Sequence, residues 1–332
     1  MLSLPNSNNC QPSDIAHPPK LLGLPPEANP ALRESIQSLE GTAPLISVIV
    51  PAYNEAAVIE RCMAALVTGH DAGELEVLVV CNGCSDDTAG IARRFGPPVR
   101  VLETEVPSKT HALNLGDAAA LGFPRVYVDA DVVMDLASVR ALAKALANET
   151  FQACSPKPKT IFGSDASWSV RAYYRFWMSL PYIQEGMIAA GVYAMSEAGR
   201  RRFEAFPDLI ADDGYVRLLF EPHERKLVDS ATSEVRVPLA LPDLMKIKTR
   251  SRFGDLQLWQ CYPELCRRDL KSKHYLHALW KILSRPGLYV AAIPYLYITF
   301  VSRLRAVKQF KSTQRYVWER DTSSRTQQPI EE

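Results

Sequence analysis

The chain has 332 residues, of which 47% are hydrophobic and 23% are charged, and its net charge is +1. This composition is that of a folded globular protein and excludes the disordered and fibrous classes. The near-neutral charge lacks the basic field that nucleic-acid binding requires, so we expect no nucleic-acid partner.

The first part of the chain lacks the patterns of an ordered domain. Residues 1–30 are rich in Pro, Asn and Ser, and we assign residues 1–43 to a flexible leader. This part has no basic stretch followed by an apolar run, so a signal peptide is not predicted. We therefore expect the protein to act in the cytoplasm.

Four short apolar runs then alternate with segments of helical spacing. The strands are predicted at residues 46–50, 75–80, 99–102 and 125–128, and the helices at residues 54–65, 87–95, 110–121 and 136–147. This alternation predicts an α/β fold with a Rossmann-like, mainly parallel sheet flanked by helices. Ligands of such sheets bind beyond the carboxyl ends of the strands. Three polar segments fall at these ends, namely residues 53–55, 82–83 and 129–131.

The pattern changes after residue 150. Aromatic residues gather between Trp168 and Tyr182, and a loop that contains Gly191 precedes a short apolar run. Residues 211–214 open a short helix. Residues 236–241 are predicted to form a strand, and residues 246–252 are a strongly basic stretch.

An apolar run at residues 287–301 is interrupted by Pro294 and is followed by five basic residues between Arg303 and Arg315. A spanning helix needs about 20 apolar residues, which this run does not reach. The basic flank favours a helix at the membrane surface, with peripheral contact through residues 282–318 at the inner face of the cell membrane. A core helix with a solvated basic face and a true span remain as alternatives.

Asp129 and Asp131 lie two residues apart, directly after the fourth predicted strand. Two carboxylates at this spacing can hold one hard cation, and Mg²⁺ and Mn²⁺ prefer oxygen ligands that they share with phosphate. Such a metal would neutralise a diphosphate leaving group. A solvated loop is the alternative for so short a motif, but its place at a strand end favours a metal site.

Four segments in order resemble the signatures of family 2 glycosyltransferases, which have the GT-A fold. Residues 48–55 resemble the opening strand, and residues 79–88 resemble the second signature. Residues 109–116 resemble the Lys-x-x-Ala-Leu-Asn segment, and residues 128–131 resemble the metal motif. The resemblance extends over roughly residues 45–255 and is strongest up to residue 135.

The resemblance implies roles for individual residues, although each of them also has a purely structural interpretation. Asn82 occupies a base-contacting position that is acidic in the family, and Cys81 replaces the preceding acidic residue. The sequence therefore leaves the identity of the nucleotide base open, with UDP as the favoured nucleotide. Asp131 and Asp129 would bind the metal, and Lys109 would lie near the nucleotide. The implied nucleotide-sugar-binding residues are Pro51, Ala52, Tyr53, Glu55, Asn82, Lys109, Asp129 and Ala130.

Inverting sugar transfer also needs a carboxylate that takes the proton of the acceptor hydroxyl. The family places this base in an acidic pair after the metal motif, and Asp212 and Asp213 occupy that place. The resemblance assigns the base to Asp213, with Asp212 as the other candidate. Adjacent carboxylates raise each other's pKa, which suits a base. Capping of the helix N-terminus by Asp212 or Asp213 is the structural alternative.

Beyond the base, processive members of the family carry a Gln-x-x-Arg-Trp motif that is absent here. Arg250 or Arg252 lies at a comparable position and would bind the diphosphate as a fork. A basic surface that faces anionic lipid is the alternative. Gly191 and Val192 are expected to border the acceptor.

The sequence therefore predicts metal-dependent, inverting transfer of a sugar from a nucleotide-sugar to a hydroxyl of a saccharide or lipid-linked acceptor. That acceptor would belong to a cell-surface or exopolysaccharide pathway, and Mg²⁺ or Mn²⁺ would be the cofactor. The alternative is a non-catalytic nucleotide-sugar or membrane-surface binding protein with the same fold. We expect residues 44–260 to form the GT-A domain, with a nucleotide-binding half at 44–135 and an acceptor half at 136–260. Residues 261–332 would form a helical C-terminal segment.

Overall fold

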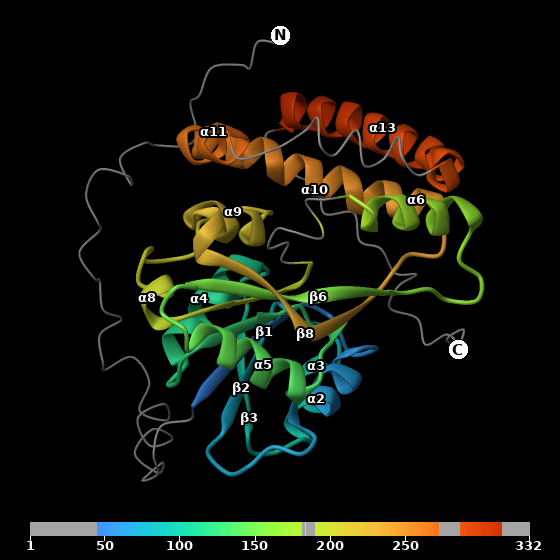
Figure 1. Ribbon diagram of the computed structural model, residues 1–332. Coiled ribbons are helices and arrows are strands. Elements are labelled where there is room, and N and C mark those ends of the chain that lie inside the picture. Colours follow the sequence, from blue (N-terminus) through green and yellow to red (C-terminus); the bar gives the residue numbers. More distant parts are fainter. Residues whose placement is uncertain (1–44, 181–182, 184–189, 272–285, 314–332) are drawn as a thin grey trace.

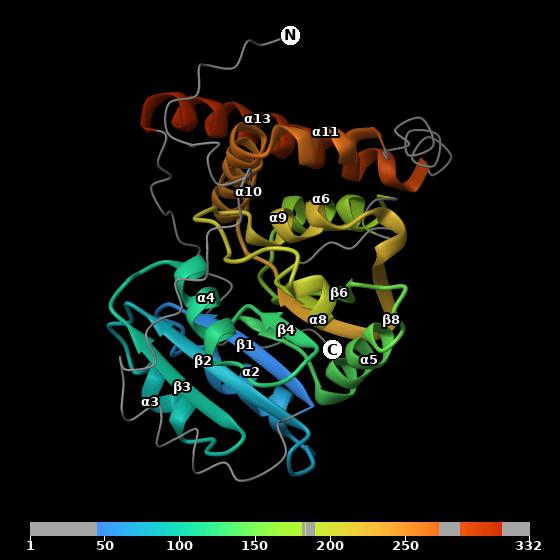
Figure 2. The same cartoon turned by 90° about the vertical axis from the view of Figure 1, so that its left-hand side faces the viewer.

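The computed structural model describes residues 45–180, 183, 190–271 and 286–313. A twisted mixed sheet with helices on both faces forms the larger part, and several helices from the C-terminal half lie together along one side of it (Figures 1 and 2). The leader at residues 1–43 lies outside the described residues.

The sheet has the strand order β3-β2-β1-β4-β7-β6-β8-β5. The first four strands in the chain are parallel, whereas β7 runs antiparallel to β4 and to β6. The prediction of a mainly parallel sheet holds for β1, β2, β3 and β4. The strands are β1 Ile46–Ala52, β2 Leu75–Asn82, β3 Val99–Thr104, β4 Arg125–Val128, β5 Val132–Val133, β6 Ala153–Ile161, β7 Val192–Met195 and β8 Arg225–Arg236.

Helices cover both faces of this sheet. Helices α2 (Ile59–Val67), α3 (Thr88–Arg93) and α5 (Leu136–Leu146) pack on one face. Helices α4 (Lys109–Ala119) and α9 (Asp212–Leu219) pack on the other. The remaining helices of the described residues are α6 Trp168–Met178, α8 Glu197–Arg200, η2 Pro222–Glu224, α10 Leu241–Cys261, α11 Pro263–Lys271, η3 Pro286–Leu288 and α13 Tyr289–Thr313.

The central strands are apolar on both sides because both of their faces are covered. In β1, Val48 and Val50 belong to the core under α2, α3 and α5, whereas Ile49 belongs to the core under α4 and α9. Tyr127 of β4 likewise points away from its neighbours Val126 and Val128. This alternation is the geometry of a pleated strand, and it explains why the runs are continuously hydrophobic.

Two sequence predictions about elements are wrong. The first helix begins at Ile59, not at residue 54, because residues 53–58 form a turn in which Asn54 has φ 51°. Residues 237–241 are not a strand: β8 ends at Arg236 and α10 begins at Leu241 with Pro242 in its first turn. Proline is favoured in the first turn of a helix and cannot donate to a strand ladder.

The C-terminal helix α13 packs along α10 and α6. Pro294 lies inside α13 and does not end it. The contacts include Tyr295 against Tyr173, with ring centroids 5.4 Å apart, and Phe310 against Phe253, at 5.1 Å. The division at residue 260 therefore stays a prediction, since α13 packs on helices that lie before it.

Candidate functional site

The loops that follow β1 and β2 are tied together at the carboxyl edge of the sheet. The backbone N–H of Ser85 donates to Asn54 Oδ1 at 2.7 Å, and that of Glu55 donates to Thr88 Oγ1 at 2.8 Å. Asp86 Oδ2 accepts from the backbone N–H of Ala56 at 3.0 Å. These bonds fix the left-handed turn at Asn54, so the two loops form one wall.

The residues predicted to line the nucleoside lie along this wall with different exposure. Pro51 and Ala52 are buried at the end of β1, and Asn82 is buried at the end of β2. The Glu55 side chain is also buried, whereas Tyr53 is 37% exposed. Within this group, Tyr53 is thus the side chain that a ligand can reach most readily.

A close approach between two segments positions the predicted metal motif. The backbone N–H of Asp129 donates to the Gly191 carbonyl at 2.7 Å, directly before β7 pairs with β4. Gly191 has φ +83°, and a Cβ there would lie 2.8 Å from Val132 Cγ2 and 3.2 Å from Asp129 Oδ2. Only glycine fits this position without strain. Gly191 and Val192, predicted to border the acceptor, therefore lie beside Asp129.

Lys109 joins the metal motif to the acidic pair. Its Nζ lies 2.8 Å from Asp129 Oδ1 and 3.0 Å from Asp212 Oδ1. The Asp212 side chain is only 2% exposed, and its Oδ2 accepts a hydrogen bond from the Tyr193 hydroxyl at 3.2 Å. Burial works to lower the pKa of Lys109, but the charges of Asp129 and Asp212 outweigh it and raise that pKa above its ordinary value. The ammonium therefore stays charged and holds three distant segments in one site.

Asp213 lies half-buried in the first turn of α9, next to Asp212. Burial and the negative charge of Asp212 raise the pKa of the Asp213 carboxyl, while the charge of Lys109 and a hydrogen bond from the Gly214 N–H act in the opposite direction. A carboxyl with a raised pKa accepts a proton more readily than an ordinary aspartate does. This is the property that a general base needs.

Asp129 and Asp131 fit a divalent cation by their chemistry. Both are carboxylates that are only partly buried, and hard cations take oxygen ligands together with phosphate oxygens and water. Among the described ranges, no group of three or more His, Cys, Asp or Glu side chains is placed to hold a metal. The substrate phosphates would therefore have to complete the coordination. Lys109 Nζ lies 2.8 Å from Asp129 Oδ1, so a cation at this motif would share that carboxylate with the ammonium.

Arg61 is a member of this site that sequence reasoning missed. It projects from α2, and its Nη2 donates to the Asp131 carbonyl at 3.3 Å. Its Nε is buried without a hydrogen-bond partner. Burial and the charge of Arg236 lower the pKa of Arg61, whereas the carboxylate of Asp131 raises it. An arginine inside a predicted helix carries no sequence signal that separates it from a surface residue.

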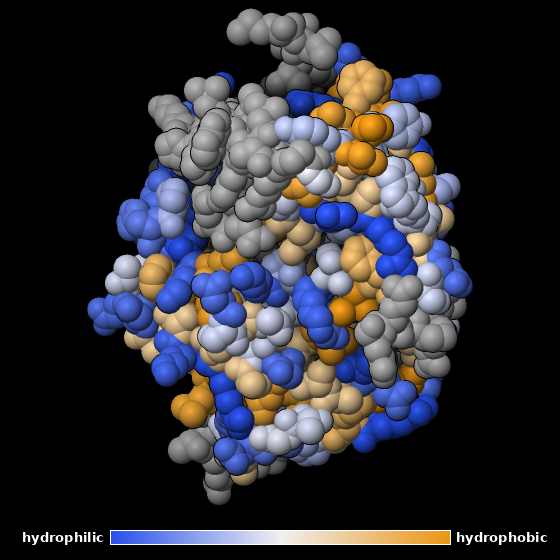
Figure 3. Space-filling model, turned by 45° about the vertical axis from the view of Figure 1, so that its right-hand side comes forward, coloured by the Kyte–Doolittle hydropathy of each residue, from blue (hydrophilic) through white to orange (hydrophobic). Residues whose placement is uncertain are grey.

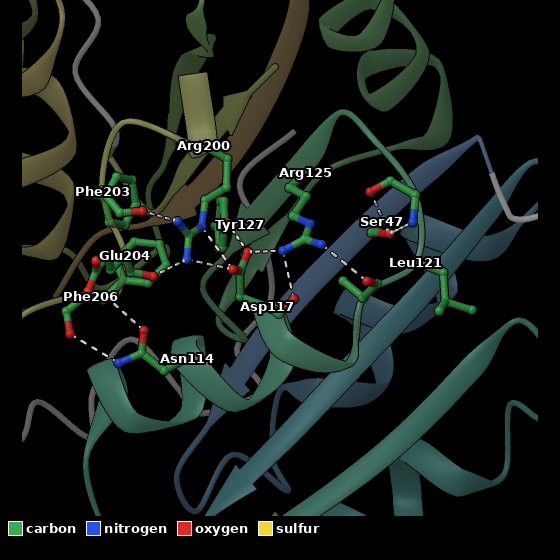
Figure 4. A network of polar contacts seen from close by, with 12 residues as sticks. Ser47, Asn114, Asp117, Leu121, Arg125, Tyr127, Arg200, Phe203, Glu204 and Phe206 are labelled. Carbon is green, nitrogen blue, oxygen red and sulfur yellow. Dashed lines mark hydrogen bonds and ion pairs between the residues drawn. The ribbon is translucent and has the colours of Figure 1, made fainter. Parts of the chain in front are cut away.

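A buried polar network stabilises the strand that carries the metal motif (Figure 4). Asp117 accepts from the Tyr127 hydroxyl at 2.6 Å and pairs with Arg125 at 2.6 Å and Arg200 at 2.7 Å. Tyr127 stacks on Tyr193 with ring centroids 4.9 Å apart. The network thereby links β4 to the tyrosine that holds Asp212.

The segment before α9 is anchored by Asn114 of the Lys-x-x-Ala-Leu-Asn segment. Asn114 Oδ1 accepts from the Phe206 backbone N–H at 2.7 Å, and its Nδ2 donates to the Phe206 carbonyl at 3.0 Å (Figure 4). This paired contact is a structural role, and it holds the chain that leads to Asp212.

The two predicted diphosphate-binding arginines lie on different sides of α10. Gly254 is the contact point with α9, since a Cβ there would be 2.9 Å from Ala211 Cβ. Arg250 is one helical turn earlier on the same face. Arg252, two residues from Gly254, lies on the other side, and its Nη1 is 3.0 Å from Asp255 Oδ2. Arg250 is therefore the better placed of the two.

Residues 47–203 match the family model described as glycosyl transferase family 2. This part of the chain belongs to that family. The membership predicted from the four motifs is thus confirmed.

The fold is confirmed by a solved structure, the mannosyltransferase PcManGT from Pyrobaculum calidifontis in complex with GDP-Man and Mn²⁺. It is 19% identical in sequence and superposes with a TM-score of 0.58. The match covers 86% of this chain and 94% of that one. At this identity the likeness shows the GT-A fold and not the substrate.

Two curated relatives match shorter stretches. Glycosyltransferase AglE of Haloferax volcanii is 35% identical over 98 residues, which cover 28% of this chain and 32% of the relative. The probable glycosyltransferase YdaM of Bacillus subtilis is 31% identical over 128 residues, covering 36% of this chain and 30% of the relative. The chain thus matches about a third of the length of these relatives.

Proposed function

We propose that this chain is a glycosyltransferase that moves a sugar from a nucleoside-diphosphate sugar to a hydroxyl acceptor with inversion at the anomeric carbon. UDP is the favoured nucleotide of the donor. Asp213 is the base, and Asp131 with Asp129 is the divalent-metal site. The observation that carries the proposal is the Lys109 bridge, because its contacts of 2.8 and 3.0 Å bring the metal motif and the acidic pair into one site.

The reaction forms a bond between the acceptor oxygen and the anomeric carbon while the bond from that carbon to the diphosphate breaks. Asp213 takes the proton of the acceptor hydroxyl, and the nucleoside diphosphate leaves with the bonding electrons. A divalent cation at Asp131 would neutralise the charge that develops on this leaving group. The Lys109 ammonium adds a fixed positive charge to the same site.

The donor pocket is supported by the tied loops after β1 and β2 and by the exposed Tyr53 ring. The PcManGT complex supports a metal-dependent reaction, since that protein of the same fold holds GDP-Man together with Mn²⁺. Asn82 in place of an acidic residue leaves the choice of base to experiment.

The C-terminal helix α13 suits contact with a membrane surface. One described helix, Tyr289–Ser312, passes the length and composition test for a membrane span. One face of α13 packs on α10 and α6, however, and the other presents large apolar side chains over the top of the molecule (Figure 3). Exposed side chains on this outer face are Tyr289, Val290, Ile293, Leu296, Tyr297, Phe300 and Leu304.

Basic side chains follow this apolar face along the same helix. Arg303, Lys308 and Lys311 are exposed toward the end of α13. An apolar face followed by cations is the pattern of a helix that lies in the plane of an anionic membrane surface. We therefore place the protein peripherally at the inner face of the cell membrane, with a saccharide on a lipid carrier as its acceptor.

A nucleotide-release screen across UDP- and GDP-sugars with Mn²⁺ or Mg²⁺ tests the proposed reaction. Asp131→Ala is expected to lose metal-dependent release, because one of the two proposed metal ligands is removed. Asp165→Ala removes an exposed carboxylate that is not part of the candidate site and serves as the matched control. Full turnover by Asp131→Ala would refute the assignment of Asp131 as a metal ligand.

Binding without turnover would favour the non-catalytic alternative. Calorimetric titration of UDP or GDP with Mn²⁺, combined with the nucleotide-release screen, separates the two cases. A non-catalytic binding protein gives heat of binding in the titration but releases no nucleotide in the screen. For the membrane contact, Ile293→Ser with Phe300→Ser is expected to reduce sedimentation with phosphatidylglycerol vesicles. Unchanged sedimentation would remove the membrane part of the proposal.

A further inference from the structure

The metal motif forms a β-turn whose two ends are held by other parts of the chain. The Val132 N–H donates to the Asp129 carbonyl at 3.0 Å and closes the turn, so the two carboxylates stand at its first and third positions. At the first position, the Asp129 N–H donates to the Gly191 carbonyl at 2.7 Å. At the third position, Arg61 Nη2 donates to the Asp131 carbonyl at 3.3 Å. Arg61 therefore tethers the residue that carries the second carboxylate.

The Arg61 side chain reaches this turn from the first turn of α2 and is half-buried on the way. Among the described residues it forms no ion pair, and its Nε is buried without a hydrogen-bond partner. The carboxylates of Asp131 and Glu55 are nevertheless near enough to act on its charge. A buried N–H without a partner costs free energy, so the stability of the fold does not explain an arginine here. The hydrogen bond that it does form goes to the metal motif.

A second arginine, Arg236 at the end of β8, lies in the same neighbourhood. The antiparallel pairing of β5 with β8 sets Val132 against Val235, so that Arg236 falls opposite Asp131 one residue further along. Arg236 is half-buried, and its charge acts on Arg61. Within the part of the chain that the structure describes, however, its side chain donates no hydrogen bond to the metal motif. The two arginines thus share charge and surroundings and differ in the tether.

We propose that Arg61 is a positioning residue for the divalent cation, because its hydrogen bond to the Asp131 carbonyl fixes the direction in which the Asp131 carboxylate meets the metal. The inference rests on the proposed function, since it takes Asp131 and Asp129 as the metal ligands. A positive charge repels a divalent cation, so Arg61 favours metal binding through its hydrogen bond and not through its field. Groups that orient a metal ligand without touching the metal commonly contribute roughly ten- to a hundredfold to metal affinity.

The test compares Arg61→Met with Arg236→Met in the full chain. Both substitutions remove a guanidinium near Asp131 and keep an unbranched side chain, but only the first removes the hydrogen bond to the metal motif. Calorimetric titration of Mn²⁺ into the protein in the presence of UDP, and separately of GDP, gives the affinity for the cation. Urea unfolding without metal shows whether either substitution destabilises the fold.

Arg61→Met is expected to weaken Mn²⁺ binding about tenfold or more, whereas Arg236→Met is expected to change it less than about threefold. The two variants are expected to unfold at the same urea concentration. In the Asp131→Ala background, Arg61→Met is expected to weaken binding less than about twofold further, because the tether acts through Asp131. Wild-type affinity in Arg61→Met, equal losses in both arginine variants, or the full loss in the Asp131→Ala background overturns the inference. A lower urea midpoint in Arg61→Met than in Arg236→Met would also overturn it, since the role would then be structural.

The role of Arg61 and the proposed reaction can fail separately. If Mn²⁺ binding depends on Arg61 but wild type releases no nucleotide from any sugar donor, sugar transfer is refuted while the role of Arg61 stands. If wild type turns over and Arg61→Met matches Arg236→Met at every Mn²⁺ concentration, the role of Arg61 is refuted while sugar transfer stands. A wild-type protein that binds no Mn²⁺ with either nucleotide would refute both the metal site and the role of Arg61.

Discussion

Replacing Lys109 by Met removes the cation that links Asp129 and Asp212. At about 3 Å and an effective dielectric constant of about 20, each unit-charge pair attracts by roughly 5 kcal/mol before desolvation is counted. The pair with Asp129 is about one-third exposed on both sides, so solvent screening leaves little net stabilisation there. Asp212 is 2% exposed, and the loss of its cation leaves a buried charge that costs about 3 to 5 kcal/mol when nothing else contacts it.

Because the Tyr193 hydroxyl still donates to Asp212 in this variant, we expect a loss below that range, about 2 to 3 kcal/mol of unfolding free energy. Urea unfolding at neutral pH, followed by tryptophan fluorescence, measures it. Adding Asp212→Asn to Lys109→Met removes the uncompensated charge and is expected to recover at least half of the loss.

The matched control is Lys157→Met, whose exposed pair with Asp229 at 3.5 Å is expected to contribute less than about 0.5 kcal/mol. If Lys109→Met were as stable as this control, or if Asp212→Asn recovered nothing, the view of Lys109 as the buried link of the site would be wrong.

Three further predictions concern the same site. Tyr193→Phe is expected to cost about 1 to 2 kcal/mol of unfolding free energy in urea, because the buried Asp212 loses a donor; no change would mean that this hydrogen bond is not formed. Gly191→Ala, at φ +83° with Asp129 Oδ2 3.2 Å from the new Cβ, is expected to lower stability by about 1 to 3 kcal/mol and to weaken nucleotide–Mn²⁺ binding in calorimetry. Wild-type nucleotide affinity in that variant would contradict the close approach. The raised pKa of Asp213 predicts that kcat/KM falls as pH is lowered through a value above the 3.8 of an ordinary aspartate, since the protonated base is inactive; a rate that stays flat down to pH 4 would exclude it.

Local patterns predicted the nucleotide-binding half well. The apolar pattern predicts the fourth strand at residues 125–128, where β4 lies, because a buried parallel strand is a continuous apolar run with a clear end. The helical pattern predicts too early a start for the first helix, because the turn at Asn54 depends on hydrogen bonds to residues 85–88 that lie far along the chain.

The contacts that define the site could not be predicted from the sequence. Lys109 was expected near the nucleotide, but its pairing with Asp212 joins residues that are about a hundred positions apart and arises only when α9 packs on the sheet. The contacts of Lys248 on α10 with the rings of Tyr173, Tyr174 and Trp177 on α6 likewise require these two helices to lie side by side. Spacing rules describe neighbours on one element and carry no information about which elements meet.

The most direct test of the proposed catalytic site is Asp213→Asn, with product formation and nucleotide affinity measured on the same preparation. The substitution keeps the size of the side chain and removes the base. We expect turnover to fall by about 10² to 10⁴ while affinity for the nucleoside diphosphate and Mn²⁺ stays within about twofold of wild type. Near-wild-type turnover in Asp213→Asn would show that another group takes the proton, and the assignment of the site would have to be abandoned.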